Sequence, residues 1–287
     1  MQTLACLNGQ QMPAEEARVS IWDRGFLLGD AVYEVFRLYR GRCWLEDEHY
    51  GRLRRSLRAL EFVNYDHERL AQRVRATIVA SAIEEGVVYI QVTRGVAPRH
   101  HHFPGPEVEP TELVVVWPYD DAATEQMRET GVYTISQPDR RWKRCNVKST
   151  NLLANVLANE AAHQAGAFEA ILVGAEGLVS EATHSSVLWV RGGRLEGTPE
   201  GPGILPGTTR RLVLRLAEDG AIAFGEAQVT LPELCACEEV MLVGTTIEVL
   251  PIVRIDGIPI SGGEPGPLSR RLQAAYRRAV ERWLAES

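Results

Sequence analysis

Two residues of this chain have surroundings that suit covalent or acid–base chemistry, and the first is Lys148. It ends the apolar part of RCNVKSTNLL and precedes a predicted helix start, where one of residues 149–151 can serve as N-cap. The positive end of a helix dipole favours the neutral amine, which is the form that attacks a carbonyl and makes a Schiff base. A surface lysine beside a helix has the same local sequence, so both interpretations of Lys148 stay open.

The second residue is Glu181, which lies among small hydroxyl residues in LVSEATHSS between two strand-like runs. A carboxylate in this position can pair with a ring nitrogen and keep it protonated, as a pyridoxal electron sink requires. A turn acid that caps local backbone N–H groups fits these residues equally well.

Three segments have the chemistry to hold a phosphate. Gly207-Thr208-Thr209 opens a predicted helix, Gly244-Thr245-Thr246 follows a predicted buried strand, and Arg52 lies in the first long helix. Glycine lets the backbone approach an anion, threonine adds a hydroxyl, and a helix N-terminus presents N–H groups. Neither Gly-Thr-Thr segment is a P-loop or a dinucleotide fingerprint, and ordinary helix caps have the same composition.

The loop RHHHFP places one permanent cation beside three histidines. Arg99 can bind a carboxylate through two hydrogen bonds, and His101 points to the same side if the backbone is extended. We expect no metal, because no carboxylate or cysteine stands at ligand spacing and consecutive side chains on an extended loop diverge. An anion site and a solvated polar loop both remain possible interpretations.

Composition narrows the class of protein. The 287 residues are 45% hydrophobic and 24% charged, with a formal net charge of -7, and no basic block could neutralise nucleic-acid phosphates. Five cysteines without a zinc or redox spacing indicate reduced thiols. Neither a signal peptide nor a membrane-spanning run is evident. We therefore expect a cytoplasmic protein with neither nucleic acid nor a membrane as partner, and no hydrolase elbow or zinc-protease motif occurs.

Periodicity predicts the elements that must position these residues. We expect strands at 31–38, 87–94, 112–117, 132–136, 168–173, 186–191 and 239–243. We expect helices at 49–60, 67–84, 151–165, 209–219 and 268–284, with Gly86 ending the second and Gly166 the third.

The order of these elements indicates an α+β or mixed fold rather than a doubly wound sheet. Polar turn residues after the strand at 112–117 suggest a domain boundary. We expect a small N-terminal α+β domain at 1–118, a linker at 119–124 and a larger C-terminal domain at 125–287 that carries Lys148.

Six segments in register resemble the class IV, or fold-type IV, pyridoxal-phosphate enzymes. They are DRGFLLGDAVYEVFRLYRG (23–41), HYGRL (49–53), VKSTNLLANVLA (147–158), EAILVGAEGLVSEATHSSV (169–187), GILPGTTR (203–210) and VGTTIEVLPI (243–252). The resemblance implies a two-domain α+β fold and a homodimer whose active sites use residues of both subunits. It also implies pyridoxal 5'-phosphate as cofactor.

The same resemblance assigns roles to individual residues. Lys148 would form the Schiff base with the cofactor, Glu181 would pair with the pyridine nitrogen, and Leu205 would pack on the ring. The phosphate would be held by Arg52, Thr208, Thr209, Thr245 and Thr246.

The loop at 93–104 resembles that of the D-amino acid aminotransferases, because TRGVAPRHHHFP contains their Arg-x-His element. On this resemblance Arg99, His101 and Tyr33 would bind the substrate carboxylate. The expected reaction is ping-pong transamination from a D-amino acid, such as D-alanine or D-glutamate, to 2-oxoglutarate or pyruvate. Ala182-Thr183-His184 departs from the pattern, and the extra histidines leave open which imidazole faces the substrate.

Other specificities within the family remain alternatives: an (R)-amine or branched-chain transaminase, or aminodeoxychorismate lyase. The continuation of the lysine motif, Ser149-Thr150-Asn151, lacks the Gly-Asn-Tyr element usual in branched-chain members. A non-catalytic protein that binds pyridoxal phosphate is a remoter alternative.

Overall fold

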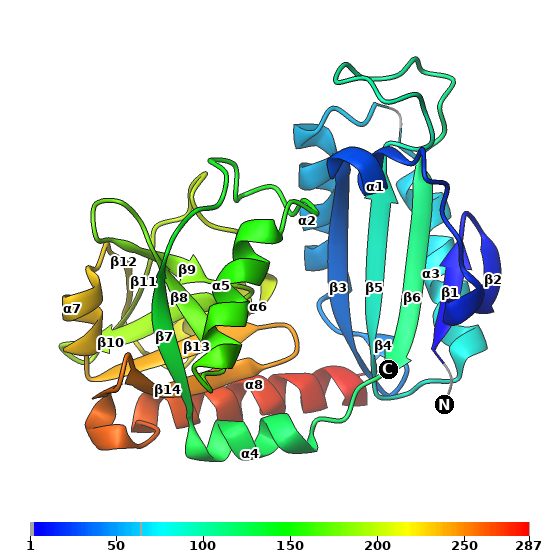
Figure 1. Ribbon diagram of the computed structural model, residues 1–287. Helices are drawn as coiled ribbons and strands as arrows, with labels where there is room; N and C mark the ends of the chain where they lie inside the picture. The colour runs from blue at the N-terminus through cyan, green and yellow to red at the C-terminus, as the bar shows by residue number, and fades with distance from the viewer. Residues whose placement is uncertain (1–2, 64, 287) are drawn as a thin grey trace. The chain divides into compact units, whose positions relative to one another are not determined.

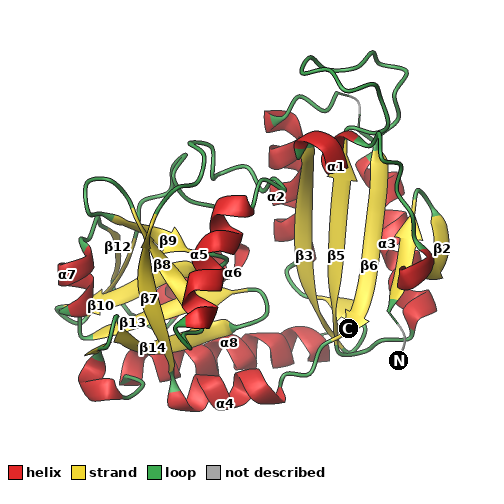
Figure 2. Cartoon of the chain, in the orientation of Figure 1, coloured by secondary structure: helices red, strands yellow, loops and turns green. Residues whose placement is uncertain are grey.

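The chain folds into two compact units, which the structure, a computed structural model, describes over residues 3–63 and 65–286. Unit 1 comprises Met1–Asp120 and Val147–Asn151, and unit 2 comprises Asp121–Asn146 and Leu152–Ser287. Helices and strands occur in both units (Figure 1, Figure 2). Their irregular alternation confirms the expected α+β class.

Unit 1 is built on a six-stranded antiparallel sheet. Its strands lie in the order β2 (Gln10–Pro13), β1 (Leu4–Leu7), β6 (Thr111–Pro118), β5 (Gly86–Thr93), β3 (Ala31–Tyr39) and β4 (Arg42–Cys43). The central strands β3, β5 and β6 form the long ladder of Figure 1. Their valine and isoleucine content suits a pleated surface that is covered on one face.

Two amphipathic helices cover that face. α2 (Glu46–Ala59) packs on β3, and α3 (His67–Ser81) packs on β6 and β1. Phe36, Ile90 and Val114 alternate with outward-facing residues and join Leu53 of α2 and Leu70 of α3 in one core cluster. A short helix, α1 (Arg24–Leu28), and a 3-10 turn, η1 (Ala14–Glu16), complete the unit.

The helix expected at 67–84 ends earlier than predicted. α3 stops at Ser81, and Ala82 adopts a left-handed conformation with φ of 52°. Gly86 is instead the first residue of β5, so its assignment as the helix terminator was wrong. A Cβ at Gly86 would lie 2.7 Å from the carbonyl oxygen of Trp117, so glycine is needed for strand packing.

Unit 2 contains a nine-stranded mixed sheet. Its main path runs β12 (Phe224–Glu226), β11 (Arg194–Gly197), β10 (Ser186–Arg191), β13 (Glu239–Gly244), β14 (Glu248–Ile255), β7 (Val132–Pro138), β8 (Glu169–Val173) and β9 (Val179–Ala182), and β15 (Ile258–Pro259) pairs with β14. β7 pairs in parallel with both β8 and β14. β9 also contacts β10, so the sheet curls toward itself.

Helices lie against this sheet. α5 (Leu153–Gln164) packs on β8 and β7, whereas α6 (Thr208–Asp219) and α8 (Pro267–Ala285) pack on β13 and on each other. α4 (Ala122–Thr130), α7 (Leu231–Cys235) and the turn η2 (Ser261–Gly263) are the remaining helical elements. Gly166 follows α5 with a φ of 67°, as expected for a glycine that ends a helix. No helix of the described residues is long and apolar enough to span a membrane.

The segment that carries Lys148 differs from expectation in two ways. First, α5 begins at Leu153, with Leu152 as N-cap and no capping side chain, so no residue of 149–151 starts a helix. The dipole argument for Lys148 was therefore wrong, because the dipole acts only within the first turn. Second, residues 147–151 group with unit 1 rather than with the C-terminal unit. α4 also takes up residues 122–124 of the expected linker.

Candidate active site

Lys148 lies in a short extended segment beside β3. Its carbonyl accepts a hydrogen bond from the N–H of Tyr33 at 3.0 Å, and Ser149 forms a β-bridge with Val32. The N–H of Lys148 donates to Oγ of Ser56 on α2 at 3.1 Å. These bonds fix the backbone on both sides of the lysine, and its Nζ lies 4.3 Å from the centre of the Tyr33 ring. Two of the predicted site residues are thus neighbours.

Arg52 belongs to a buried ionic cluster with Glu34 and His49. Its Nε and Nη2 donate to the two carboxylate oxygens of Glu34 at 2.7 and 2.8 Å, and Nδ1 of His49 lies 2.8 Å from Oε2. Burial alone raises the pKa of Glu34, but Arg52 and His49 outweigh burial and leave it well below its usual range. Burial lowers the pKa of His49, which favours the neutral ring.

This cluster qualifies the role expected for Arg52. Two of its nitrogens already donate to Glu34, so contact with a phosphate rests on its remaining N–H groups. Sequence reasoning missed Glu34, although its position two residues before Phe36 places it on the helix-covered face of β3.

Two arginines, Arg24 and Arg94, anchor the loop that carries the residues predicted to bind the substrate carboxylate. Asp30 accepts hydrogen bonds from Nε of Arg24 and from Nε of Arg94, each at 2.8 Å. Nη1 of Arg24 then donates to the carbonyl of His100 at 2.7 Å. The guanidinium of Arg94 lies 3.7 Å from the centre of the Phe103 ring. These contacts explain why a loop rich in proline and histidine is ordered.

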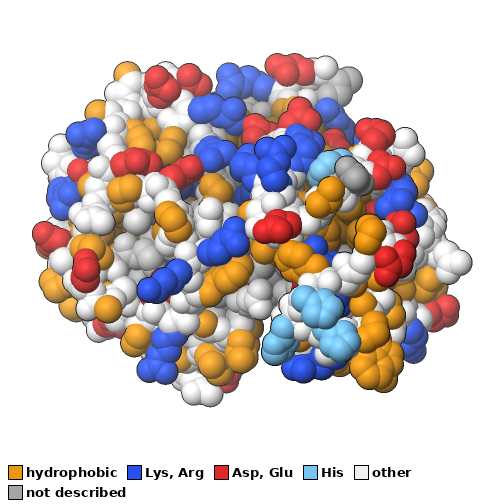
Figure 3. All heavy atoms as spheres, turned by 90° about the horizontal axis from the view of Figure 1, so that it is seen from above, with side chains coloured by type: hydrophobic (Ala, Val, Ile, Leu, Met, Phe, Trp, Pro, Cys, Tyr) orange, Lys and Arg blue, Asp and Glu red, His pale blue; other side chains and the backbone are white. Residues whose placement is uncertain are grey.

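The histidines of this loop divide into two groups. Figure 3 shows several histidine side chains gathered on the surface, and the chain has one run of three, at 100–102. The rings of His100 and His102 stack at 5.1 Å with an angle of 8° between them, so His101 is the one outside this pair. Arg99 and His101 are both exposed. The structure does not join them to Lys148 or Tyr33 by any hydrogen bond among its described residues.

Glu181, in unit 2, is held from two sides. The N–H of Leu205 donates to both its carboxylate oxygens, at 3.1 and 3.2 Å, and Nη1 of Arg141 donates to Oε1. Arg141 is fixed in turn by both oxygens of Asp139, at 3.0 and 2.7 Å. Leu205 was predicted as a neighbour of the cofactor, whereas sequence reasoning missed Arg141 and Asp139. The basic run DRRWKR before Lys148 was the available signal.

The two Gly-Thr-Thr segments approach the chain just after Glu181. α6 begins directly after Gly207, and a Cβ on this glycine would lie 2.8 Å from Oγ of Ser186. A Cβ on Gly244 would lie 3.5 Å from Oγ of Ser185. Unit 2 thus brings together the predicted ring-nitrogen acid and both predicted phosphate segments.

Arg128 holds the turn that contains Thr245 and Thr246. Its Nε donates to the carbonyl of Ile247 at 3.0 Å, and its Nη2 donates to the carbonyl of Thr246 at 3.2 Å. Asp121 engages the other edge of the guanidinium, with both contacts at 2.9 Å. The carbonyl side of the turn therefore faces Arg128. An anion bound at this turn would have to contact the N–H and hydroxyl groups of the turn itself.

A fully buried carboxylate, Glu169 of β8, fixes the segment after Glu181. It accepts hydrogen bonds from the N–H of His184 at 2.5 Å and from Oγ of Ser185 at 2.8 Å. The hydroxyl of Thr183 donates to it at 3.1 Å. The unusual His184 lies with Nδ1 3.1 Å from Glu169 and is about half exposed.

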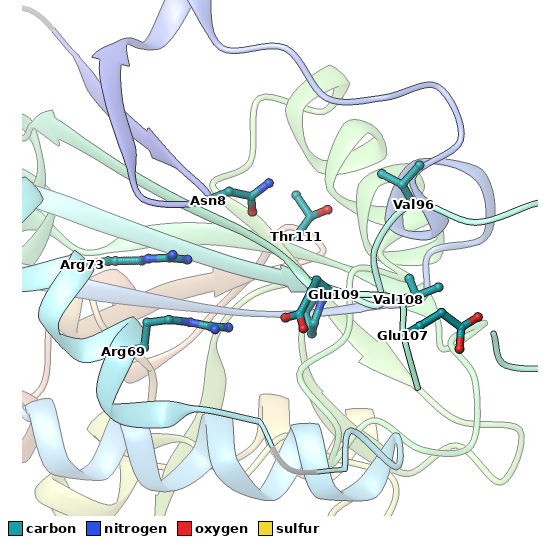
Figure 4. Close-up of a pocket in the computed structure, with 9 residues that line it drawn as sticks. Asn8, Arg69, Arg73, Val96, Glu107, Val108, Glu109 and Thr111 are labelled. Carbon is teal, nitrogen blue, oxygen red and sulfur yellow. The ribbon is translucent and has the colours of Figure 1, made fainter. Parts of the chain in front are cut away.

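A cavity of about 510 Å³ opens elsewhere in unit 1 (Figure 4). Arg69 and Arg73 reach toward it from α3, and both donate to the buried Glu112, at 3.0 and 2.5 Å. Glu107 and Glu109 line the same cavity, so charges of both signs face it. Its lining, as far as the structure describes it, includes none of the predicted site residues. Nor do the described residues group three potential ligands for a metal ion.

Known proteins resemble this chain over most of its length. A family model described as amino-transferase class IV matches residues 31–255. A D-alanine aminotransferase of Staphylococcus aureus (strain MSSA476) is 40% identical over 276 residues, which cover 96% of this chain and 97% of that protein. A D-alanine aminotransferase of Bacillus licheniformis is 38% identical over 274 residues, 95% of each chain.

Solved structures agree. A branched-chain amino acid aminotransferase of T.th. with pyridoxamine 5'-phosphate superimposes with a TM-score of 0.88 at 26% identity, covering 98% of this chain and 94% of that one. The branched-chain aminotransferase of Thermoproteus uzoniensis with norvaline gives a TM-score of 0.83 at 28% identity, covering 97% and 94%. These matches confirm the fold, the family and the enzyme class expected from the six sequence segments. The chain belongs to the class IV aminotransferases.

Proposed function

We propose that this enzyme transfers the amino group of a D-amino acid, such as D-alanine or D-glutamate, to a 2-oxo acid such as 2-oxoglutarate or pyruvate. Its cofactor would be pyridoxal 5'-phosphate. The similarity to D-alanine aminotransferases over nearly the whole chain supports the donor class. The observation that carries the cofactor is the convergence, in unit 2, of Glu181 with the segments that begin at Gly207 and Gly244.

The residues of unit 2 suit both ends of this cofactor. At the phosphate end, α6 starts at the buried Thr208 with no capping side chain among the described residues, and such a helix start offers N–H groups to an anion. At the ring end, the carboxylates of Asp139 and Glu181 and the guanidinium of Arg141 sum to a net charge of −1. A protonated ring nitrogen would balance that charge.

Each predicted residue then has a defined task. Lys148 would hold the cofactor covalently, Glu181 would bind the ring nitrogen, and Leu205 would pack on the ring. The phosphate would be bound by Arg52, Thr208, Thr209, Thr245 and Thr246.

Proton transfer falls to Lys148. Pyridoxal phosphate supplies an electron sink for the negative charge that develops at the substrate's α-carbon. The Nζ of Lys148 would take the α-proton as general base and return it as general acid in each half-reaction. The backbone bonds of Lys148 to Tyr33 and Ser56 leave only its side chain free to make this movement.

Arg99, His101 and Tyr33 would bind the substrate carboxylate. A guanidinium binds a carboxylate through two parallel hydrogen bonds and so fixes its plane as well as its position. The enzyme would select D-amino acids if this binding of the carboxylate turns the α-proton of the D-enantiomer toward Nζ of Lys148. The anchoring of the loop by Arg24 at the carbonyl of His100 supports this role, because it fixes the backbone between Arg99 and His101.

A homodimer fits the surface of unit 1. Large apolar side chains are about half exposed or more on α1 and on the two loops beside it: Val19, Ile21, Trp22, Phe26, Val96 and Phe103. The bridge between Asp23 and Val96 holds two of these segments side by side. An exposed apolar group of this kind marks an interaction surface, and a second copy would cover it. The cytoplasmic location stays a prediction.

The direct test is Lys148→Ala in the purified protein reconstituted with pyridoxal phosphate. The wild type should absorb in the visible and lose that band when D-alanine is added, whereas the variant should have neither the band nor transaminase activity. A wild-type band in the variant would show that another residue binds the cofactor.

The branched-chain alternative is favoured by the structural matches, and a donor panel separates it. D-alanine, D-glutamate, L-leucine and (R)-1-phenylethylamine are each mixed with the enzyme in a single turnover, and loss of the visible band is followed. Fast loss with D-alanine supports the proposal. Fast loss of the band with L-leucine alone would indicate a branched-chain transaminase instead. Fast loss with (R)-1-phenylethylamine alone would indicate an (R)-amine transaminase.

A further inference from the structure

Several hydrogen bonds fix the side chain of Arg141 beside Glu181. Its Nε and Nη2 donate to the two oxygens of Asp139, and Nη2 also donates to the carbonyl of Gly203 at 3.1 Å. Ser180, whose Oγ donates to Asp139 at 2.7 Å, braces the same carboxylate. The side chain of Arg141 is 7% exposed, so its position is set by these bonds and hardly by solvent.

These bonds direct the third guanidinium nitrogen of Arg141, Nη1, at Oε1 of Glu181. Burial lowers the pKa of Arg141, but its bonds to Asp139 and the nearby charge of Glu181 outweigh burial and leave it above the usual range. Burial raises the pKa of Asp139, and Arg141 again outweighs it, so this pKa lies below its usual value. Asp139 and Arg141 are therefore both charged near pH 7.

The location of a shared proton follows from this arrangement. When a ring nitrogen and a carboxylate share one proton, the proton stays on the stronger base. A buried carboxylate without a cation becomes a stronger base, because burial disfavours its charged form. A guanidinium bonded to that carboxylate weakens it as a base, and the proton remains on the ring.

We propose that Arg141 is a positioning residue that keeps Glu181 ionised and aimed, so that the cofactor's ring nitrogen, and not Glu181, carries the shared proton. This inference rests on the proposed function, in which Glu181 faces that nitrogen. Asp139 has the matching task of fixing Arg141. A protonated ring is the better electron sink, so the pair acts on the rate of the chemical step.

Arg210 and Cys145 also lie within electrostatic reach of Glu181. Arg210 is buried and donates to the carbonyl of Thr198 at 2.6 Å, and burial lowers its pKa from the ordinary value. Cys145 donates to the carbonyl of Trp142, and burial raises its pKa to about 11, so the thiol is neutral near pH 7. Arg141 bonds Glu181 directly.

The decisive variant is the double substitution Asp139→Asn with Arg141→Met. It removes one carboxylate and one guanidinium, so the net charge of the cluster stays at −1, while Glu181, whose side chain is 8% exposed, loses its bonded guanidinium. The holoenzyme is loaded with pyridoxal phosphate carrying 15N in its ring, and the nitrogen resonance reports directly whether that atom is protonated. Arg277→Met, which breaks other ion pairs of unit 2 with Asp121 and Glu248, is the matched control.

The wild type and the control should show a protonated ring nitrogen at neutral pH. In the double variant the resonance should move to the unprotonated position, and kcat should fall by about 10- to 100-fold, the range for losing a group that orients a ligand. KM for D-alanine should change far less than kcat. Arg141→Lys keeps the positive charge and loses the planar guanidinium. This variant should show the resonance of a protonated ring nitrogen and retain only part of the wild-type kcat.

An unprotonated ring in the wild type, or a protonated ring with wild-type kcat in the double variant, overturns the inference. If the double variant does not fold, Asp139→Asn alone decides. It raises the net charge of the cluster from −1 to 0, so the ring nitrogen should lose its proton at a lower pH, and an unchanged pH counts against the inference. Failure of the proposed function would look different, because the wild type would then bind no pyridoxal phosphate or convert no donor.

Discussion

The buried pair of Glu34 and Arg52 offers a test of the architecture that does not depend on catalysis. Glu34→Gln keeps the shape of the side chain and removes its charge. In the folded chain one amide oxygen can still accept from Nε of Arg52, but the amide NH₂ then faces Nη2 of Arg52 and Nδ1 of His49, which lie 2.8 Å from the present oxygen. The substitution therefore removes the carboxylate that pairs with the buried guanidinium of Arg52.

The expected cost follows from burial. Glu34 is fully buried and Arg52 is 4% exposed. Breaking such a pair from one side costs about 3–5 kcal/mol, and we expect the lower end because one hydrogen bond survives. Adding Arg52→Met should return part of the loss, since the double variant carries no unpaired charge. A comparable substitution at the surface, Glu68→Gln opposite the exposed Arg75, should stay within about 0.5 kcal/mol of wild type.

The free energy of unfolding is measured by urea titration of the apoprotein, followed by circular dichroism. Amide hydrogen exchange along β3 assigns the change to unit 1, because two units need not unfold together. A loss in Glu34→Gln no larger than that in Glu68→Gln would refute the reasoning, since it would mean that the buried pair contributes no more than an exposed one.

The same contacts support three further predictions. Burial raises the pKa of Glu34, but Arg52 and His49 outweigh burial and lower it, so as the pH falls the unfolded chain binds a proton at Glu34 before the folded chain does. Urea titrations should therefore show the free energy of unfolding decreasing as the pH drops below about 4.3, and decreasing less steeply in Glu34→Gln. Gly86→Ala should cost about 1–3 kcal/mol against the carbonyl of Trp117, whereas Gly51→Ala, with no neighbour closer than 3.6 Å, should be neutral or stabilising in thermal melts. Arg99→Ala should lower kcat/KM about 30-fold or more for D-alanine but little for (R)-1-phenylethylamine, and equal losses would argue against a carboxylate site.

Local pattern predicted the elements better than it predicted their ends. The alternation in β3 and the leucine spacing in α2 are consequences of one buried face, and sequence displays such a face directly. The end of α3 depends instead on Ala82 in a left-handed conformation, and the start of α5 lacks a capping side chain. Neither feature has a signature in residue type.

The candidate site shows the same division. Lys148, Glu181 and the Gly-Thr-Thr segments could be named from short motifs, because their chemistry is carried by residue type. Their partners could not be named. Arg141 and Glu181 are 40 positions apart, so only the fold brings them together.

The residues that sequence reasoning missed have one feature in common, because each forms an ion pair with a buried charged side chain. Glu34 offsets Arg52 in unit 1, and Arg141 offsets Asp139 and Glu181 in unit 2. On the proposed function, the ion pair with Glu34 reduces the net positive charge that Arg52 could offer a phosphate. The proposed phosphate binding would then draw on oriented N–H groups at the start of α6 and in the turn at 244–246, which carry no net charge that salt can screen. In unit 2 the charges of Asp139, Arg141 and Glu181 sum to −1, which the ring cation of the proposed function would balance.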